Sequence, residues 1–238
     1  MRFDSEYVYF DIEDIAKMKF KKITGHSFVG LIGYDNFNKV GDTLLYMHNI
    51  LPNVVDPKWL KRGDYAEELV HKVYKRDYPD NVIVRYDDKK AINYDNFENI
   101  YLNLGGIIDL EDLSINKIIE VKSKSMKDYD RIDKVKPLNE VYQGLLYTFL
   151  RKYDDLTMEW IFFDSESENL LFEGKKPNTN KNLKRISFDI KCNHDEMKQL
   201  CQKALKIVHN FRKEYRIKLS DISPKNIELL KKIKMEEK

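Results

Sequence analysis

Alternating apolar and polar positions predict a pair of β-strands near the middle of the chain. Residues 107–110 and 117–121 are rich in β-branched side chains, and the polar segment between them is typical of a hairpin turn. Side chains alternate between the two faces of a strand, so Glu120 and Lys122 should point to the same face, roughly 6–7 Å apart. Asp109 falls on the first strand of the pair. These charged residues stand out in an otherwise apolar hairpin.

The rest of the pattern predicts helices around a sheet. Apolar positions recur at helical spacing in residues 57–77, 137–153 and 195–218. A final helix begins with Ser223 as its N-cap and Pro224 at its first position. Short apolar runs predict strands at residues 82–86, 99–104, 158–163, 170–172 and 184–190. We expect an α/β fold with a mixed central sheet flanked by helices, one domain over residues 1–220, and a C-terminal helix, 221–238, that packs on the core or on another subunit.

Composition limits the class of protein. The chain has 238 residues, of which 42% are hydrophobic and 34% charged, as expected for a folded enzyme with a polar surface. Its net charge of +2 is close to neutral, so any DNA-binding field must be local. The two cysteines, Cys192 and Cys201, do not suggest a disulfide framework. We find no signal peptide or membrane-spanning run and expect a cytoplasmic protein without a membrane partner.

The charged residues of the hairpin suggest a specific chemistry. Carboxylates such as Asp109 and Glu120 are hard ligands suited to Mg²⁺ or Mn²⁺. The ammonium group of Lys122 could orient an attacking water or offset charge in a transition state. Such an arrangement suits phosphodiester hydrolysis. The alternative is an ordinary cross-strand salt bridge on a solvated face.

The residues resemble those of a known nuclease superfamily. Asp109 followed by Glu120-Val121-Lys122 is similar to the D…(D/E)xK core of the PD-(D/E)xK nucleases, and the chain resembles their lambda-exonuclease-type, or YqaJ-like, viral recombinase branch. Four short segments support this in the expected order: residues 23–27 (ITGHS), 63–67 (GDYAE), 109–122 and 143–147 (QGLLY). There are two departures. Ile108 replaces the proline before Asp109. No arginine lies shortly upstream of Ser27, where the family usually has a basic residue, so Lys21 or Lys22 would have to take that role.

The resemblance implies a PD-(D/E)xK, restriction-endonuclease-like core and a divalent-metal site. Asp109, Glu120 and the backbone carbonyl of Val121 would hold Mg²⁺, for which Mn²⁺ could substitute, and Lys122 would act on the attacking water. Periodicity does not decide whether Glu67 or Glu68 faces the site. The family pattern selects Glu67, as a further ligand of the metal or of its water. The alternative for this glutamate is a solvated position on a charged helix.

Further residues acquire roles through the same resemblance. Gln143 and Tyr147 lie four apart on one helix, so they share a face. In the related nucleases this glutamine supports the catalytic site and the tyrosine reaches the DNA backbone. Both could instead be boundary residues of an amphipathic helix. The basic, hydroxylated strand end at 123–127 predicts that Lys124 contacts a phosphate.

The segment around Ser27 is expected to bind the end of the DNA. The start of a helix is a suitable site for anions, and in the resembling family this segment contacts the 5′ phosphate. That role would fall to Ser27, with Thr24, His26 and Lys22 beside it. The alternative for Thr24 and Ser27 is a simple N-cap.

The resemblance also implies an activity and partners. It implies a 5′-to-3′ exonuclease that acts on double-stranded DNA ends and leaves 3′ single-stranded tails for recombination. It further implies a single-strand annealing protein as partner, a trimeric ring, and a phage-encoded enzyme in the cytoplasm of a bacterial host. Two cysteines cannot ligate the four-cysteine iron–sulfur cluster of some relatives, so no cluster is expected. The alternatives are a DNA endonuclease of the same superfamily and an inactive nuclease-fold module that binds DNA.

Overall fold

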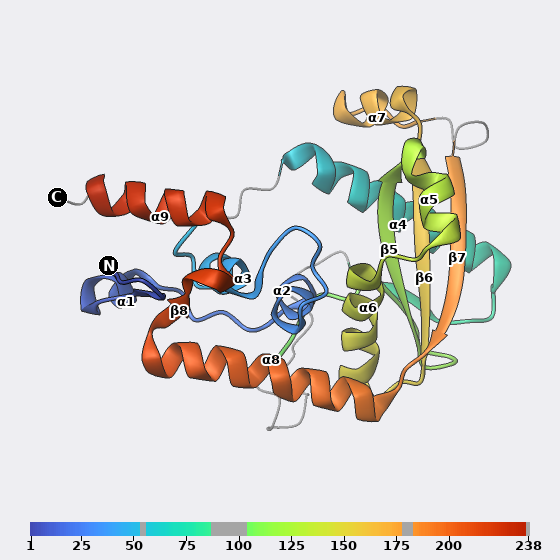
Figure 1. Ribbon diagram of the computed structural model, residues 1–238. Helices are drawn as coiled ribbons and strands as arrows, with labels where there is room; N and C mark the ends of the chain where they lie inside the picture. Colours follow the sequence, from blue (N-terminus) through green and yellow to red (C-terminus); the bar gives the residue numbers. More distant parts are fainter. Residues whose placement is uncertain (53–55, 87–103, 178–182, 237–238) are drawn as a thin grey trace. The chain divides into compact units, whose positions relative to one another are not determined.

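The computed structural model describes residues 1–52, 56–86, 104–177 and 183–236 (Figure 1). The chain divides into two compact units. Unit 1 contains Met1–Val54, Glu98–Gly105 and Asp195–Lys238, and unit 2 contains Val55–Phe97 and Gly106–His194. Most of the strand predicted at 99–104 lies outside the described residues. The single domain over residues 1–220 stays a prediction. No helix in the described ranges combines the length and the apolar character that a membrane span requires.

A five-stranded mixed sheet forms the centre of unit 2. Its strands, in spatial order, are β3 (Ile83–Arg85), β4 (Leu110–Asp112), β5 (Lys117–Ser125), β6 (Asp155–Phe163) and β7 (Leu183–Lys191). β5 and β6 run parallel, whereas the other neighbouring pairs are antiparallel. A parallel pair needs a crossover, and this one contains α5 (Tyr129–Lys134) and α6 (Leu138–Leu150). The sheet confirms the predicted α/β class.

Different helices cover the two faces of β5 and β6. The face toward α4 (Pro57–Asp77) carries apolar side chains from both strands, namely Ile119, Val121, Ile161 and Phe163. On the other face, Gly144 of α6 lies against Leu156 and Met158 of β6. Because alternate residues of a strand point to opposite faces, Glu120 and Lys122 lie on the α6 side.

The start of α4 is fixed by its local sequence. Asp56 is the N-cap, and its side chain accepts a hydrogen bond from the backbone N–H of Lys58 at 2.9 Å. Pro57 follows at the first helical position, where its missing N–H has no consequence. The helix ends at Asp77, so the predicted bounds are confirmed.

The strand predicted at 170–172 is wrong, because these residues end the helix α7 (Ser165–Phe172). Asp164 caps this helix by accepting a hydrogen bond from the backbone N–H of Ser167 at 2.8 Å. Leu171 is buried in the cluster beneath α4. The short apolar run is therefore the buried side of a helix, a case that the run itself does not distinguish from a strand.

Unit 1 combines short helices with a small antiparallel sheet. The sheet has the order β1 (Arg2–Phe3), β2 (Tyr7–Tyr9) and β8 (Arg216–Lys218). The helices are α1 (Ile12–Lys17), α2 (Gly25–Ile32), α3 (Val40–Met47), α8 (His194–Glu214) and α9 (Pro224–Glu236). The predicted helix 195–218 ends earlier than expected, because Tyr215 adopts a φ of 47°, and the chain continues as β8. Left-handed residues of this kind commonly end helices.

The C-terminal helix α9 packs on α3 through a buried polar network. Asp42 of α3 is fully buried, and its Oδ1 accepts hydrogen bonds from Ser223 and from Nδ2 of Asn226 at 2.7 Å. Asn226 also pairs with the hydroxyl of Tyr46. Buried carboxylates need such donors. These contacts hold α9 against α3 within unit 1, and packing of this helix on another subunit stays a prediction.

In unit 2, α6 rests directly on the segment that leads to β4. A Cβ at Gly106 would lie 2.1 Å from Cε1 of Tyr147 and 2.7 Å from its hydroxyl oxygen. Tyr147 is only 5% exposed, so its ring has little room to move. The close approach therefore requires a glycine three residues before Asp109.

We expect Gly106→Ala to lower the free energy of unfolding of unit 2 by about 1–3 kcal/mol, because the added methyl overpacks the site. Combining it with Tyr147→Ala should cost less than the sum of the two single changes. Urea unfolding of the three variants measures both effects. Gly63→Ala is the matched control: its Cβ would meet nothing within 4 Å, and alanine favours the interior of α4. Equal stability of Gly106→Ala and the wild type would contradict the packing role.

Candidate active site

Asp109 and Glu120 approach each other across the β4–β5 pair. Asp109 lies in a bend just before β4, and not on the strand as predicted. The antiparallel register pairs Leu110 with Ile119, so one further step places Asp109 opposite Glu120. Oδ2 of Asp109 accepts a hydrogen bond from the backbone N–H of Val121 at 2.8 Å. The aspartate thus faces the strand that carries Glu120.

Lys122 completes the cluster. Its Nζ donates a hydrogen bond to Oε1 of Glu120 at 2.6 Å. The Glu120 carboxylate is fully buried, whereas 19% of the Lys122 side chain is exposed. The structure therefore brings Asp109, Glu120 and Lys122 together, with Glu120 buried and the other two partly exposed. This is not the solvated salt bridge that the sequence left open.

Burial and charge act together on the two titratable groups of β5. Burial, and then the nearby Asp109 carboxylate, raise the pKa of Glu120 to about 8. Burial alone would lower the pKa of Lys122, but the carboxylates of Glu120 and Asp109 outweigh it and raise that pKa above its ordinary value. The site therefore holds an excess of negative charge that favours a proton or a metal cation.

Glu120 differs from a second buried glutamate on the adjoining strand. Both oxygens of Glu159 on β6 are bound by Arg185, at 2.6 and 2.7 Å. Oε2 of Glu120, in contrast, has no hydrogen-bond partner within the described parts of the chain. Glu111 also has one such oxygen, Oε1, but Arg151 pairs with its other oxygen, Oε2, at 2.7 Å. What distinguishes Glu120 is the second carboxylate, Asp109, beside it.

These features fit a hard divalent cation. A buried carboxylate oxygen without a donor, next to a second carboxylate, provides the oxygen ligands that Mg²⁺ prefers. Across the ranges that the structure describes, no three His, Cys, Asp or Glu side chains group closely enough to hold a metal ion. Water and the carbonyl of Val121 are the predicted further ligands beside Asp109 and Glu120.

Glu67 occupies a less direct position. It lies on α4, and its Oε2 is 3.5 Å from Nη2 of Arg85. Its charge is also among those that raise the pKa of Glu120, after burial and Asp109. Glu67 is thus near the site and paired with an arginine, and its role as a metal or water ligand stays a prediction.

Helix α6 presents a polar stripe to the same face of β5. Nε2 of Gln143 lies 3.5 Å from the hydroxyl of Tyr147, so the predicted pair does share a face. Tyr147 is buried against Gly106, which gives it a packing role, and its contact with DNA stays a prediction. The ammonium of Lys124 pairs with Glu140 at the start of α6. Sequence reasoning missed Glu140, although it lies three residues before Gln143 on the same face.

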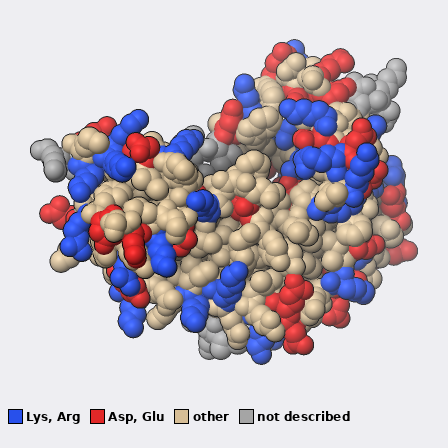
Figure 2. Space-filling view, viewed as in Figure 1, with Lys and Arg blue, Asp and Glu red and all other residues tan. Residues whose placement is uncertain are grey.

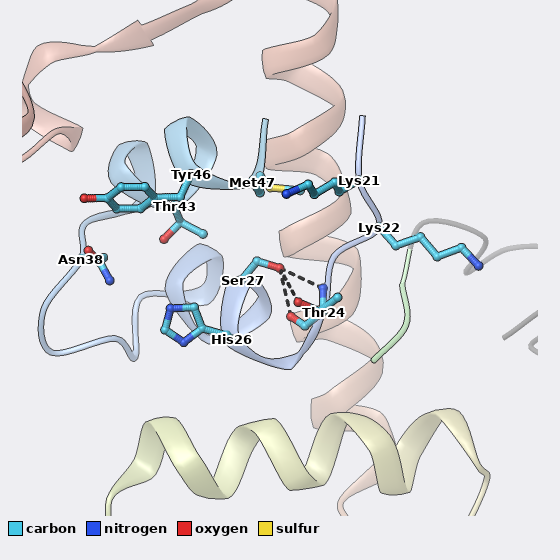
Figure 3. A pocket seen from close by; sticks show the side chains of 9 residues that line it. All are labelled: Lys21, Lys22, Thr24, His26, Ser27, Asn38, Thr43, Tyr46 and Met47. Atoms are coloured by element: carbon cyan, nitrogen blue, oxygen red, sulfur yellow. Dashed lines mark hydrogen bonds between the residues drawn. The ribbon is translucent and has the colours of Figure 1, made fainter. Parts of the chain in front are cut away.

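The residues predicted to bind the DNA end line a pocket in unit 1. Its volume is about 260 Å³, and its lining includes Lys21, Lys22, Thr24, His26, Ser27, Asn38, Thr43, Tyr46 and Met47 (Figure 3). Thr24 is the N-cap of α2, and its backbone N–H donates to Oγ of Ser27 at 2.8 Å. The Ser27 hydroxyl in turn donates to the carbonyl of Thr24 at 3.0 Å. Both residues therefore cap the helix, and their contact with a phosphate stays a prediction.

An arginine that the sequence analysis missed supports the edge of this pocket. Nη2 of Arg212 on α8 donates to the backbone carbonyl of Lys21 at 2.8 Å, and its Nε donates to Nε2 of His48 at 3.1 Å. Burial lowers the pKa of His48 to about 4, which keeps the ring neutral and able to accept this bond. Arg212 is 191 residues from Lys21, so sequence spacing could not have indicated the contact.

Charge on the surface is mixed. In Figure 2, Lys and Arg side chains alternate with Asp and Glu over much of the visible face, and a group of basic side chains lies over the part of unit 2 that carries α5. This distribution agrees with the net charge of +2 and with the expectation that any field attractive to DNA is local.

Known structures share this fold. No protein-family model matches the sequence, and no curated protein matches it. The crystal structure of a phage-related exonuclease from Haemophilus somnus 129PT superposes with a TM-score of 0.54 at 16% identity, covering 82% of this chain and 96% of the other. That of an alkaline exonuclease from Laribacter hongkongensis gives 0.56 at 10% identity, covering 86% and 94%. The chain therefore has the fold of these exonucleases, which confirms the resemblance to the lambda-exonuclease type at the level of the fold.

Proposed function

We propose that the protein is a metal-dependent deoxyribonuclease, with Asp109, Glu120 and Lys122 as its catalytic group. The observation that carries this proposal is the buried Glu120 carboxylate. One of its oxygens has no donor in the part of the chain that the structure describes, a second carboxylate lies opposite, and an ammonium group lies at 2.6 Å. Few structural roles call for two carboxylates beside one lysine, because the cluster is costly to bury. Phosphodiester hydrolysis uses each of these groups.

Each residue has a separate task in the reaction. Asp109, Glu120 and the carbonyl of Val121 would bind Mg²⁺. When bound, the cation would offset negative charge on the scissile phosphate and lower the pKa of a water molecule. Lys122 would donate a hydrogen bond to the attacking water oxygen and orient it toward phosphorus. The new P–O bond forms as the bond to the leaving oxygen breaks, and that oxygen takes up a proton. Gln143 lies on α6, which covers this face of β5, and would support the catalytic side chains.

The hypothesis that the enzyme is an exonuclease has separate support. Two solved structures with this fold are those of a phage-related exonuclease and an alkaline exonuclease. The pocket in unit 1 has the size and the lysines to accept a terminal phosphate. We therefore propose 5′-to-3′ digestion of double-stranded ends, leaving 3′ tails. A trimeric ring, an annealing partner and a phage origin belong to the same proposal through the resemblance.

Linear duplex DNA should be degraded in Mg²⁺ or Mn²⁺ and preserved in EDTA, and covalently closed circles should persist in both. Lys122→Ala should lower the rate about 100- to 1000-fold, the usual cost of one preorganised donor, and leave DNA binding intact. Gel analysis of both substrates, with filter binding, measures these outcomes. Lys198→Ala is the control, because that exposed lysine lies on α8 and belongs neither to the cluster nor to the residues predicted to contact DNA. Cleavage of circles would indicate an endonuclease, and binding without cleavage an inactive module.

Replacing both pocket lysines, Lys21→Ala with Lys22→Ala, should reduce the preference for 5′-phosphorylated over 5′-hydroxyl ends about tenfold. The estimate corresponds to one charge-assisted hydrogen bond of about 1.5 kcal/mol. Initial rates on the two ends give the ratio. Lys17→Ala with Lys19→Ala removes the same charge from residues outside the pocket lining. The assignment is wrong if the variant without Lys21 and Lys22 keeps the preference for 5′-phosphorylated ends while the variant without Lys17 and Lys19 loses it.

A further inference from the structure

Glu140 is held in one orientation beside the cluster on β5. Nε1 of Trp160, a fully buried side chain of β6, donates to its Oε2 at 2.7 Å. The ammonium of Lys124 pairs with its other oxygen. Only 12% of the Glu140 side chain is exposed. A partly buried carboxylate with a donor on each oxygen has little freedom to reorient.

The position of Glu140 relates it to Lys122. Lys122 and Lys124 are two residues apart on β5, so both point to the α6 face, where Glu140 receives Lys124. The register of β5 and β6 pairs Lys122 with Trp160, and Trp160 is the residue that holds Glu140. The Glu140 carboxylate therefore lies on the side of the sheet that carries Lys122, outside the cluster of Asp109, Glu120 and Lys122.

Binding of a divalent cation would change the contact between Lys122 and Glu120. A cation held by Asp109 and Glu120 competes with the Lys122 ammonium for Oε1 of Glu120, since like charges repel at such distances. Lys122 must then leave Glu120 while remaining close enough to act on a water. A fixed carboxylate on the same face of the sheet, shared with Lys124, would stabilise the displaced position.

We propose that Glu140 is the positioning residue for Lys122: it retains the lysine ammonium beside the site when Glu120 is engaged by the cation. This role rests on the proposed function. Trp160 and Lys124 fix the carboxylate in advance, so no reorganisation accompanies the exchange. Glu140 itself touches neither cation nor substrate in this role, and it acts through Lys122.

A double-mutant cycle on cation binding tests the role without relying on cleavage. Mn²⁺ is titrated calorimetrically into the DNA-free protein, as wild type, Glu140→Gln, Lys122→Met and the double variant. Glu140→Gln should weaken Mn²⁺ binding about three- to tenfold, because Lys122 then stays on Glu120. Lys122→Met should tighten binding by removing the competitor. In the Lys122→Met background, Glu140→Gln should have no further effect.

The outcomes separate this role from others. An equal effect of Glu140→Gln in both backgrounds means that Glu140 acts on the cation directly or through the fold, and overturns the proposal. Thermal unfolding checks the fold, and Glu140→Asp, which keeps the charge, should restore at least part of the affinity. Wild-type protein that neither binds Mn²⁺ nor degrades DNA overturns the nuclease function and this role with it. Wild-type binding and cleavage without coupling overturn this role alone.

Discussion

The ion pair between Glu120 and Lys122 is the constraint on which the rest of unit 2 depends. A carboxylate fully removed from water is strongly unfavourable unless a cation or donors compensate it. Lys122 compensates one oxygen only, and the other lacks a donor among the described residues. The sheet therefore maintains an incompletely satisfied anion in a fixed place. Stability alone would not select such an arrangement, whereas a cation-binding site requires it.

The architecture follows from keeping that anion apart from the apolar core. Strand alternation sends the apolar residues of β5 toward α4 and the charged ones toward α6. Helix α6 can approach closely because Gly106 and Gly144 offer no side chain at its contacts. The same helix supplies Gln143 and Glu140 to the charged face. One short helix therefore closes the site and provides its supporting polar groups.

Sequence reasoning predicted that Glu120 and Lys122 share a face because that feature depends on local periodicity. Period-two alternation was enough to place Glu120 and Lys122 on one face, and helical spacing gave the bounds of α4. It failed where a short run is ambiguous and where long-range contacts decide. The run at 170–172 ends a helix that Asp164 caps, and Glu140 contacts Trp160, twenty residues away. Thr24 is the N-cap of α2 with Ser27 in its capping box, and α3, which the pattern did not predict, supplies part of the lining of the pocket beside them.

The choice of His48 as the partner of Arg212 has an electrostatic consequence. A carboxylate in that position would orient the guanidinium equally well but would cancel its charge. The neutral imidazole accepts one N–H and leaves a full positive charge behind the backbone of Lys21. With a pKa near 4, the ring keeps this state across the physiological range. Arg212 therefore adds a lasting positive charge behind the backbone of Lys21, beyond the charges of the two lysines that line the cavity.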